Sequence, residues 1–174
     1  MSAGIFIALL VNSSEAPFIV YANNELKKTD SIRKVFTIRV IFIFISTILF
    51  IFLAIALQDY FIKFAYINKN QFLFLIMAYL GIGLRFFFGS TFLALNKRLL
   101  NAMYELMTNA VSILYILALY LFLGITLENI FLMFFIAPVI AALFFIPKFD
   151  FEKLFPLKFD KKKFKKMLNY TKWT

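Results

Sequence analysis

One arginine lies near the middle of a long apolar stretch, where it could do chemistry. The stretch FLIMAYLGIGLRFFFGSTFLALNKRLL runs from Phe74 to Leu100, and Arg85 is its first charged residue. A guanidinium keeps its proton, and placing it at a bilayer centre costs about 2.5–3.5 kcal/mol or more. Its planar fork suits phosphate. Arg85 is therefore the first candidate for binding an anionic group within the membrane.

Carboxylates in other apolar segments offer a structural alternative to such an anion site. An ion pair with Glu15 or Glu105, or a side chain that extends toward interfacial water, would explain Arg85 without any ligand. The two explanations are compatible, because a resting ion pair can open when a phosphate arrives. We select three candidate substrate-binding residues, Arg85, Glu15 and Asn12. Glu105 lies closer to the expected cytoplasmic end of its segment and is assigned no role.

The residues that many enzymes and metal sites use are missing from the chain. It contains no Cys and no His, which excludes disulfides, thiolate or imidazole metal ligands and histidine bases. We also find no spaced aspartate pair of the kind used in magnesium-dependent lipid phosphotransfer, and no Gly-rich phosphate loop. We therefore expect no enzymatic activity, no catalytic residue, no metal and no cofactor.

The composition indicates that membrane-spanning helices carry the candidate residues. Hydrophobic residues make up 63% of the chain and charged residues 16%, with a mean hydropathy of +0.88, which is outside the range of soluble globular proteins. Five segments are long and apolar enough to span a bilayer. They cover residues 3–22, 40–57, 71–95, 102–123 and 127–146 approximately. We predict an all-α, polytopic membrane helix bundle over residues 1–147.

Basic residues in alternate segments predict the orientation of this bundle. They cluster between Lys27 and Arg39, at Lys97 and Arg98, and in nine lysines after residue 147. Segments rich in Lys and Arg stay in the cytoplasm, so we expect a multi-pass protein of the cell membrane with its N-terminus outside and its C-terminus in the cytoplasm. These segments also explain the net charge of +10, and no nucleic-acid partner is expected.

Residues 148–174 are predicted to be a basic, amphipathic cytoplasmic linker. In FDKKKFKKMLNYTKWT, the side chains of Phe164, Met167 and Leu168 fall near one face of a helix, with Asp160 as its N-cap. The lysines occupy the other face. We expect this helix, over residues 160–172, to rest on the anionic inner leaflet with its apolar face among the headgroups. Membrane lipids are thus expected partners.

Three stretches resemble parts of a known family. PFIVYANNELKKTDSIRKVFTIRVIFIF resembles a second helix, charged cytoplasmic turn and third helix, and FLALNKRLLNAMYELMTNAVSILYILALYLFLGI resembles a fourth helix, basic turn and fifth helix. KFDKKKFKKMLNYTKWT resembles the linker to a seventh helix. This layout is similar to the polysaccharide and lipid-linked oligosaccharide flippases of the multidrug/oligosaccharidyl-lipid/polysaccharide exporter superfamily. The resemblance implies an N-terminal fragment with helices two to six, without the first helix and the second half that alternating access requires.

The resemblance also implies a function. The complete transporter would move an isoprenoid-pyrophosphate-linked sugar to the outer leaflet, with Arg85 on the pyrophosphate and Glu15 and Asn12 as polar neighbours. Its missing second half would be a partner. Three alternatives remain: a fragment of a cation-coupled multidrug-type exporter, which would favour an acidic cavity; a membrane enzyme acting on lipid-linked sugars, which would need carboxylates in a large outer loop; and a non-catalytic membrane subunit.

Overall fold

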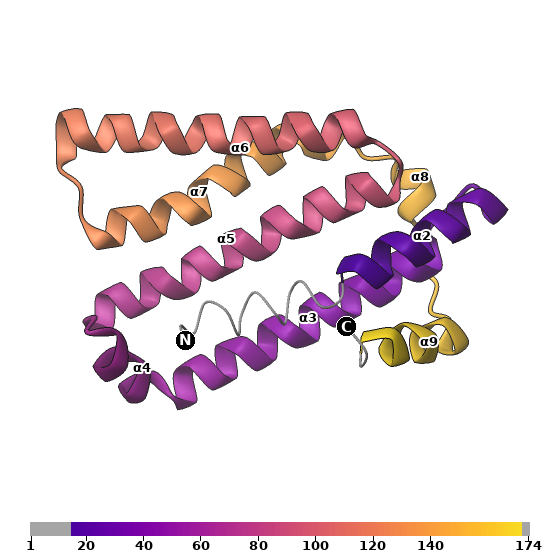
Figure 1. The fold of residues 1–174 in the computed structure, drawn as a ribbon, viewed down its shortest axis with the longest axis horizontal. Coiled ribbons are helices and arrows are strands. Elements are labelled where there is room, and N and C mark those ends of the chain that lie inside the picture. The colour runs from indigo at the N-terminus through magenta and orange to yellow at the C-terminus, as the bar shows by residue number, and fades with distance from the viewer. Residues whose placement is uncertain (1–14, 172–174) are drawn as a thin grey trace. The chain divides into compact units, whose positions relative to one another are not determined.

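The computed structural model describes residues 15–171, and every regular element in that range is a helix. The helices follow one another through short connections, as Figure 1 shows. They are α2 (Glu15–Thr29), α3 (Arg33–Ala56), α4 (Gln58–Ala65), α5 (Lys69–Ala94), α6 (Arg98–Ala118), the π-helical η1 (Leu119–Leu123), α7 (Leu127–Phe145), the 3-10 helix η2 (Ile146–Lys148), α8 (Phe151–Leu154) and α9 (Lys161–Thr171). The predicted all-α fold class is confirmed.

Four of these helices are long and apolar enough to cross a membrane. They cover Arg33–Ala56, Lys69–Ala94, Arg98–Phe122 and Leu127–Lys148. In their most apolar stretches, 17% of α3, 11% of the α6 span and 33% of the α5 and α7 spans are buried, so many aliphatic and aromatic side chains face outward as a lipid environment favours. These helices mark a membrane-embedded protein. Most of the predicted span at residues 3–22 lies outside the described residues, and that span stays a prediction.

The basic segment between the first two predicted spans is mostly helical. α2 continues to Thr29, and α3 begins at Arg33 rather than near the predicted Val40. Asp30 turns the chain with a left-handed φ of 51°, and the hydroxyl of Thr29 donates to the Glu25 carbonyl at 3.0 Å. Hydropathy does not predict this extension, because charged residues lower the local hydropathy without interrupting the helical backbone.

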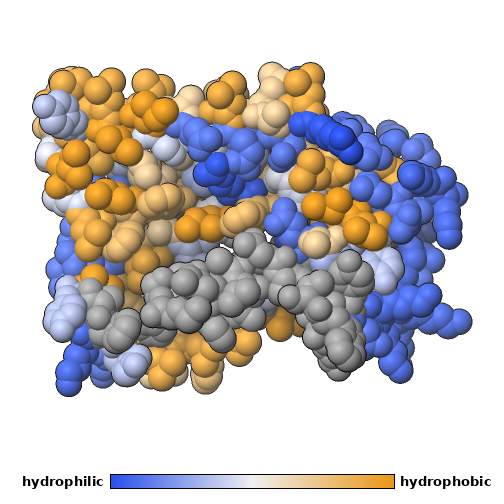
Figure 2. Space-filling model, viewed as in Figure 1, coloured by the Kyte–Doolittle hydropathy of each residue, from blue (hydrophilic) through white to orange (hydrophobic). Residues whose placement is uncertain are grey.

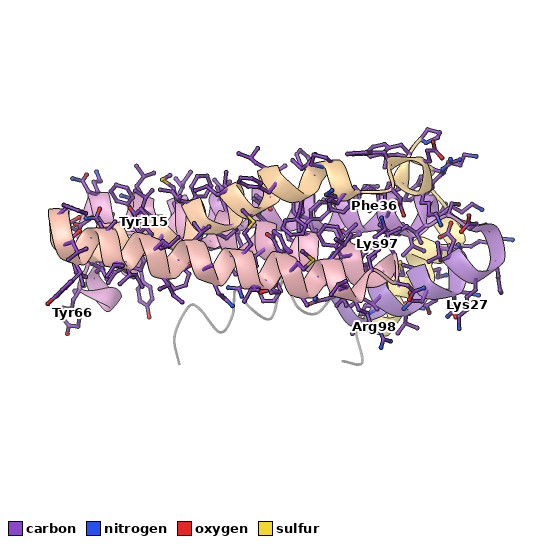
Figure 3. All side chains as sticks on the ribbon, turned by 90° about the horizontal axis from the view of Figure 1, so that it is seen from above. Lys27, Phe36, Tyr66, Lys97, Arg98 and Tyr115 are labelled. Atoms are coloured by element: carbon purple, nitrogen blue, oxygen red, sulfur yellow. The ribbon has the colours of Figure 1, made fainter. Side chains whose placement is uncertain are left out.

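The chain divides into two compact units. Unit 1 comprises residues 1–46, 86–101 and 148–174, and unit 2 comprises residues 47–85 and 102–147. Figure 3 labels exposed side chains of both, among them Lys27 and Arg98 of unit 1 and Tyr66 of unit 2.

The core of unit 1 includes the apolar face of α9. Met167 is 1% exposed, and the Phe164 ring stacks on Phe42 of α3 with 5.3 Å between centroids. Both contact a cluster of buried side chains, Phe18, Ala22, Ile32, Val35, Phe36, Ile38, Ala94, Leu95 and Leu154. The helix predicted in the tail is present, but Phe164 and Met167 of its apolar face pack against protein and are not free to enter the headgroups. Leu168 is 37% exposed, and its entry into the headgroups stays a prediction.

Glu25 joins three helices of unit 1. Its carboxylate accepts hydrogen bonds from the backbone N–H groups of Lys34 and Val35, at 3.3 and 3.1 Å, in the first turn of α3. It also pairs with Lys163 of α9 at 2.9 Å. Glu25 is only 6% exposed, and these partners offset the cost of burying its charge, because helix N-terminal amides and an ammonium group both stabilise a carboxylate. Glu25 therefore fixes the position of α9 on α2 and α3.

Within unit 2, α5 and α7 approach each other closely at Gly81. A Cβ built on Gly81 would lie 2.5 Å from the Cα of Phe135 and would also clash with the carbonyl group of Phe134. Gly83, two residues further along, has nothing within 4 Å of its Cβ position. Close helix contact through glycine is common in membrane bundles, and Gly81 makes that contact here.

Candidate functional site

Arg85 of α5 is held by two residues of α6 within unit 2. Its Nε donates to Oε2 of Glu105 at 2.7 Å, and its Nη2 donates to the same oxygen. Nη2 also donates to Oδ1 of Asn109 at 3.1 Å. Glu105 and Asn109 lie four residues apart, so they share one face of α6. We call these three residues the Arg85 cluster.

The antiparallel connection of α5 and α6 explains this meeting. Arg85 precedes the end of α5 by nine residues, and Glu105 and Asn109 follow the start of α6 by seven and eleven. Both helices rise about 1.5 Å per residue, which places Arg85 at a depth between its two partners. The ion pair of Arg85 with Glu105, one of the two pairings considered from the sequence, is confirmed. Counting residues outward from the short turn would have favoured Glu105 over Glu15.

The Arg85 cluster is only partly buried. The side chain of Arg85 is 32% exposed and that of Glu105 is 34% exposed, and Asn109 is exposed. Figure 2 shows hydrophilic surface amid the hydrophobic surface over α5 and α6. Nη1 of Arg85 donates no hydrogen bond to any residue in the range 15–171. A guanidinium has five N–H donors, so this side of Arg85 can still bind an anion.

Two neighbouring hydroxyl groups of α6 take no part in the Arg85 cluster. Oγ1 of Thr108 donates to the carbonyl of Tyr104, and Oγ of Ser112 donates to the carbonyl of Thr108, both at 2.9 Å. Such bonds to the residue four positions earlier satisfy a hydroxyl within its own helix. The polar character of this part of α6 therefore comes from Glu105 and Asn109.

The other two predicted site residues are not brought to Arg85 by the described structure. Glu15 is the first residue of α2 in unit 1, whereas Arg85 belongs to unit 2, and their pairing stays a prediction. The carboxylate of Glu15 instead interacts electrostatically with Arg39. Asn12 lies outside the described residues, and its place beside Arg85 stays a prediction as well.

Arg39 is a buried arginine that the sequence analysis grouped with cytoplasmic basic residues. Its exposed fraction is 0%, and its guanidinium carbon lies 5.5 Å from the centroid of the Phe18 ring, a cation–π distance. The signal that would have found it is helical spacing. Ile32, Val35 and Phe36 are buried and precede Arg39 by seven, four and three residues, which places Arg39 on the same side of a helix. Arg39 belongs to the core of unit 1, and we assign it a packing role.

Comparisons with known proteins add no family assignment. No family model, no curated protein and no solved structure matches the chain. Within residues 15–171, no group of three or more Asp, Glu, His or Cys side chains is arranged to hold a metal ion. The Arg85 cluster and the helices that carry it are therefore the features that bear on function.

Proposed function

We propose that the chain is part of a membrane transporter of the flippase type, in which Arg85 binds the pyrophosphate of an isoprenoid-linked sugar. The observation that supports this is a guanidinium in an apolar span with one edge held by Glu105 and Asn109 and with Nη1 available. A purely structural ion pair does not require the Arg85 side chain to stay 32% exposed, with Nη1 donating no hydrogen bond within residues 15–171. Binding of a pyrophosphate accounts for the exposure of Arg85 as well as for its charge.

The chemistry of the Arg85 cluster suits this substrate class. In a site of lowered dielectric, a fixed cation offsets much of the cost of drawing a phosphate out of bulk water. Arg85 binds in a defined orientation, because Asn109 and Glu105 restrict its rotation before any ligand arrives. Glu105 acts as the resting counterion, and the arriving phosphate replaces it in part. This is the role that the sequence analysis considered for Glu15.

The alternative of a cation-coupled exporter has less support. Such a transporter needs a carboxylate that is available to a cation or a drug, whereas Glu105 is already neutralised by Arg85. Glu15 is the remaining candidate for that role, and its carboxylate interacts with Arg39. A non-catalytic membrane subunit would account for the four spans but not for the accessible edge of Arg85.

A complementation experiment tests the proposal. The chain, preceded by the first helix of an oligosaccharide flippase, is co-expressed with the second half of that flippase in cells that lack their own. We expect rescue with the parent chain, loss of rescue with Arg85→Ala and Arg85→Glu, and partial rescue with Arg85→Lys, which keeps the charge without the fork. Arg98→Ala, at an exposed basic residue of the same helix pair, is the control and should rescue fully.

A binding experiment separates substrate recognition from assembly. Geranyl pyrophosphate is titrated into the full chain in detergent, with geraniol as the control that lacks the phosphates. We expect binding that depends on the pyrophosphate and on Arg85. If all three Arg85 variants express normally and bind and rescue like the parent, Arg85 is structural and the proposal fails. If Glu15→Gln abolishes rescue while Arg85→Ala does not, the cation-coupled exporter is the better explanation.

A further inference from the structure

The lysines of α9 lie on two different sides of the helix. Lys163 faces the protein and pairs with Glu25 at 2.9 Å. Four others are exposed, and none of them forms an ion pair with another residue of the range 15–171: Lys161, Lys162, Lys165 and Lys166. We call these four residues the lysine face. Like charges four residues apart repel one another, so α9 keeps this face at a cost to its own stability.

The orientation of the lysine face is set by contacts on the opposite side of α9. Met167 and Phe164 are packed into the core of unit 1. Asp160 caps the helix, because its Oδ1 accepts from the N–H groups of Lys162 and Lys163 at 3.0 and 3.1 Å. Its Oδ2 pairs with Lys34 at 3.3 Å. The four lysines are therefore directed away from the protein before any partner binds.

The attachment of α9 to α3 gives its level along a membrane-spanning helix. In the segment that leads into α9, the N–H of Lys158 donates to Oγ1 of Thr37 at 2.8 Å, and within α9 Phe164 stacks on Phe42. At 1.5 Å per residue, Thr37 and Phe42 lie about 6 and 14 Å from the start of α3. The continuous apolar run of α3 begins at Val40. The headgroup region adds about 5–7 Å on each side of the hydrocarbon core, so α9 is attached at the level of the headgroups.

We propose that the lysine face of α9 is a binding surface for the phosphate headgroups of anionic lipids. Because Phe164 and Met167 are occupied by contacts with protein, binding comes from charge and not from insertion of these two side chains into the acyl chains. Lipid is the partner that this position favours, since headgroups surround α3 at this level on every side that protein leaves open. Figure 2 shows hydrophilic surface concentrated over α2, α8 and α9.

The test measures how much anionic lipid the protein retains. The full chain is reconstituted in nanodiscs of phosphatidylcholine with a minority of phosphatidylglycerol, and the ratio of the two lipids bound after extraction is measured by native mass spectrometry. The double variant Lys165→Gln/Lys166→Gln is compared with Lys63→Gln/Lys69→Gln, which removes the same charge from exposed positions in unit 2. We expect the affinity for phosphatidylglycerol to fall about fivefold per lysine removed from α9 at low salt.

Four outcomes decide the proposal. Selective loss in the α9 variant, together with loss of the parent's preference at high salt, supports it. Unchanged lipid ratios overturn it, and so does an equal fall in the control variant, which would mean that only total charge matters. The chain has no Cys, so a fluorophore on Asn169→Cys, at an exposed position of α9, reports one position alone. Quenching of that label by nitroxides on the acyl chains would show an inserted helix and would overturn the docked arrangement.

Discussion

The residue that raises the functional question, Arg85, is neither fully paired nor free. Glu105 neutralises it and Asn109 orients it, yet about a third of both charged side chains remains exposed. Partial exposure lowers the contribution of an ion pair, since solvent screens it. Within a membrane the same exposure requires a polar surrounding, because hydrocarbon does not solvate charge. The pair is therefore expected to stabilise the protein modestly and to remain open to exchange.

A double-mutant cycle measures that modest contribution. Arg85→Ala and Glu105→Ala each leave a charge without its partner and should lower the unfolding free energy by about 1–3 kcal/mol. The double variant should be less destabilised than the sum of the two, with a coupling energy of about 0.5–1 kcal/mol. Unfolding in mixed micelles, followed by circular dichroism, gives these values. Strict additivity would show that the ion pair carries no energy.

Removing the charge of Glu105 should improve anion binding at Arg85. Glu105→Gln keeps a hydrogen-bond acceptor for the guanidinium but no longer competes with phosphate for it. We expect the affinity for geranyl pyrophosphate to rise about tenfold, which corresponds to about 1.4 kcal/mol. Isothermal titration of the detergent-solubilised chain measures this change, with Asn109→Ala as the comparison that loses orientation without changing charge. Weaker binding by Glu105→Gln would contradict the role of Glu105 as a competing counterion.

At the scale of the elements, the contact between α5 and α7 depends on Gly81, because glycine has no side chain. Gly81 allows the backbone of α7 to approach, and Pro138 is buried further along the same helix. Membrane helices associate through close packing rather than through a hydrophobic driving force, so a small interfacial residue matters more than it would in water.

Gly81→Ala should destabilise the protein, whereas Gly83→Ala should not. The added methyl group at Gly81 meets the backbone of Phe134 and Phe135, which cannot rotate away, and overpacking of this kind costs about 1–3 kcal/mol. At Gly83 the methyl group enters open space, and the better helix propensity of Ala should stabilise slightly. The midpoints of thermal unfolding in detergent compare the two variants directly. Equal midpoints would mean that α5 and α7 do not approach at Gly81.

The docking of α9 should depend on pH through its cap. Hydrogen bonding from the backbone of Lys163 lowers the pKa of Asp160 below its usual 3.8, and the side chain of Lys34 acts in the same direction. A lowered pKa means that folding favours the ionised carboxylate. Its contribution is therefore complete above the unfolded pKa and is lost as the pH falls through the folded value.

If protonation of Asp160 weakens the cap, α9 should separate from α2 and α3. A spin label on Asn169→Cys can follow this separation. We expect label mobility to increase only as the pH falls below the ordinary Asp value of 3.8 and through the lowered pKa of Asp160, where the carboxylate becomes protonated. Asp160→Asn should already show increased mobility at neutral pH and a smaller further change in acid. If the label in Asp160→Asn is as immobile as in the parent, the cap does not hold α9 in place.

At the scale of the whole molecule, charge is divided unevenly between the two units. Unit 1 contains sixteen of the nineteen basic residues and six of the nine acidic residues, so it carries the whole net charge of +10, while unit 2 is neutral. Lys and Arg near the ends of spans are retained on the cytoplasmic side. The orientation stays a prediction from this same charge pattern, with the connections that belong to unit 1 in the cytoplasm.

Reporter fusions test that orientation. Fusions after Asn24, Lys97 and Lys158, all in unit 1, should read as cytoplasmic, and fusions after Asn68 and Leu127, both in unit 2, should read as external. A phosphatase reporter that is active outside and a fluorescent reporter that is active inside give complementary readings. A reversed pattern would contradict both the orientation and the assignment of the lysine face to the inner leaflet.

The sequence by itself determined the all-α class, most of the apolar spans, the helix in the tail and the choice of Arg85. The span predicted at 71–95 appears as Lys69–Ala94 and that at 127–146 as Leu127–Phe145, because hydropathy and helical period are properties of neighbouring residues. The extension of α3 to Arg33 was missed for the same reason, since charge lowers local hydropathy there.

Only the tertiary structure decided which faces of different helices meet. It brought Glu105 and Asn109 to Arg85, buried Arg39 beside Phe18, and packed Phe164 and Met167 of α9 against protein. A one-dimensional pattern shows that a side chain is polar or apolar, but the partner depends on the crossing and rotation of whole helices. The identity of each contact is thus a property of packing, even where the need for a contact is plain from the residue alone.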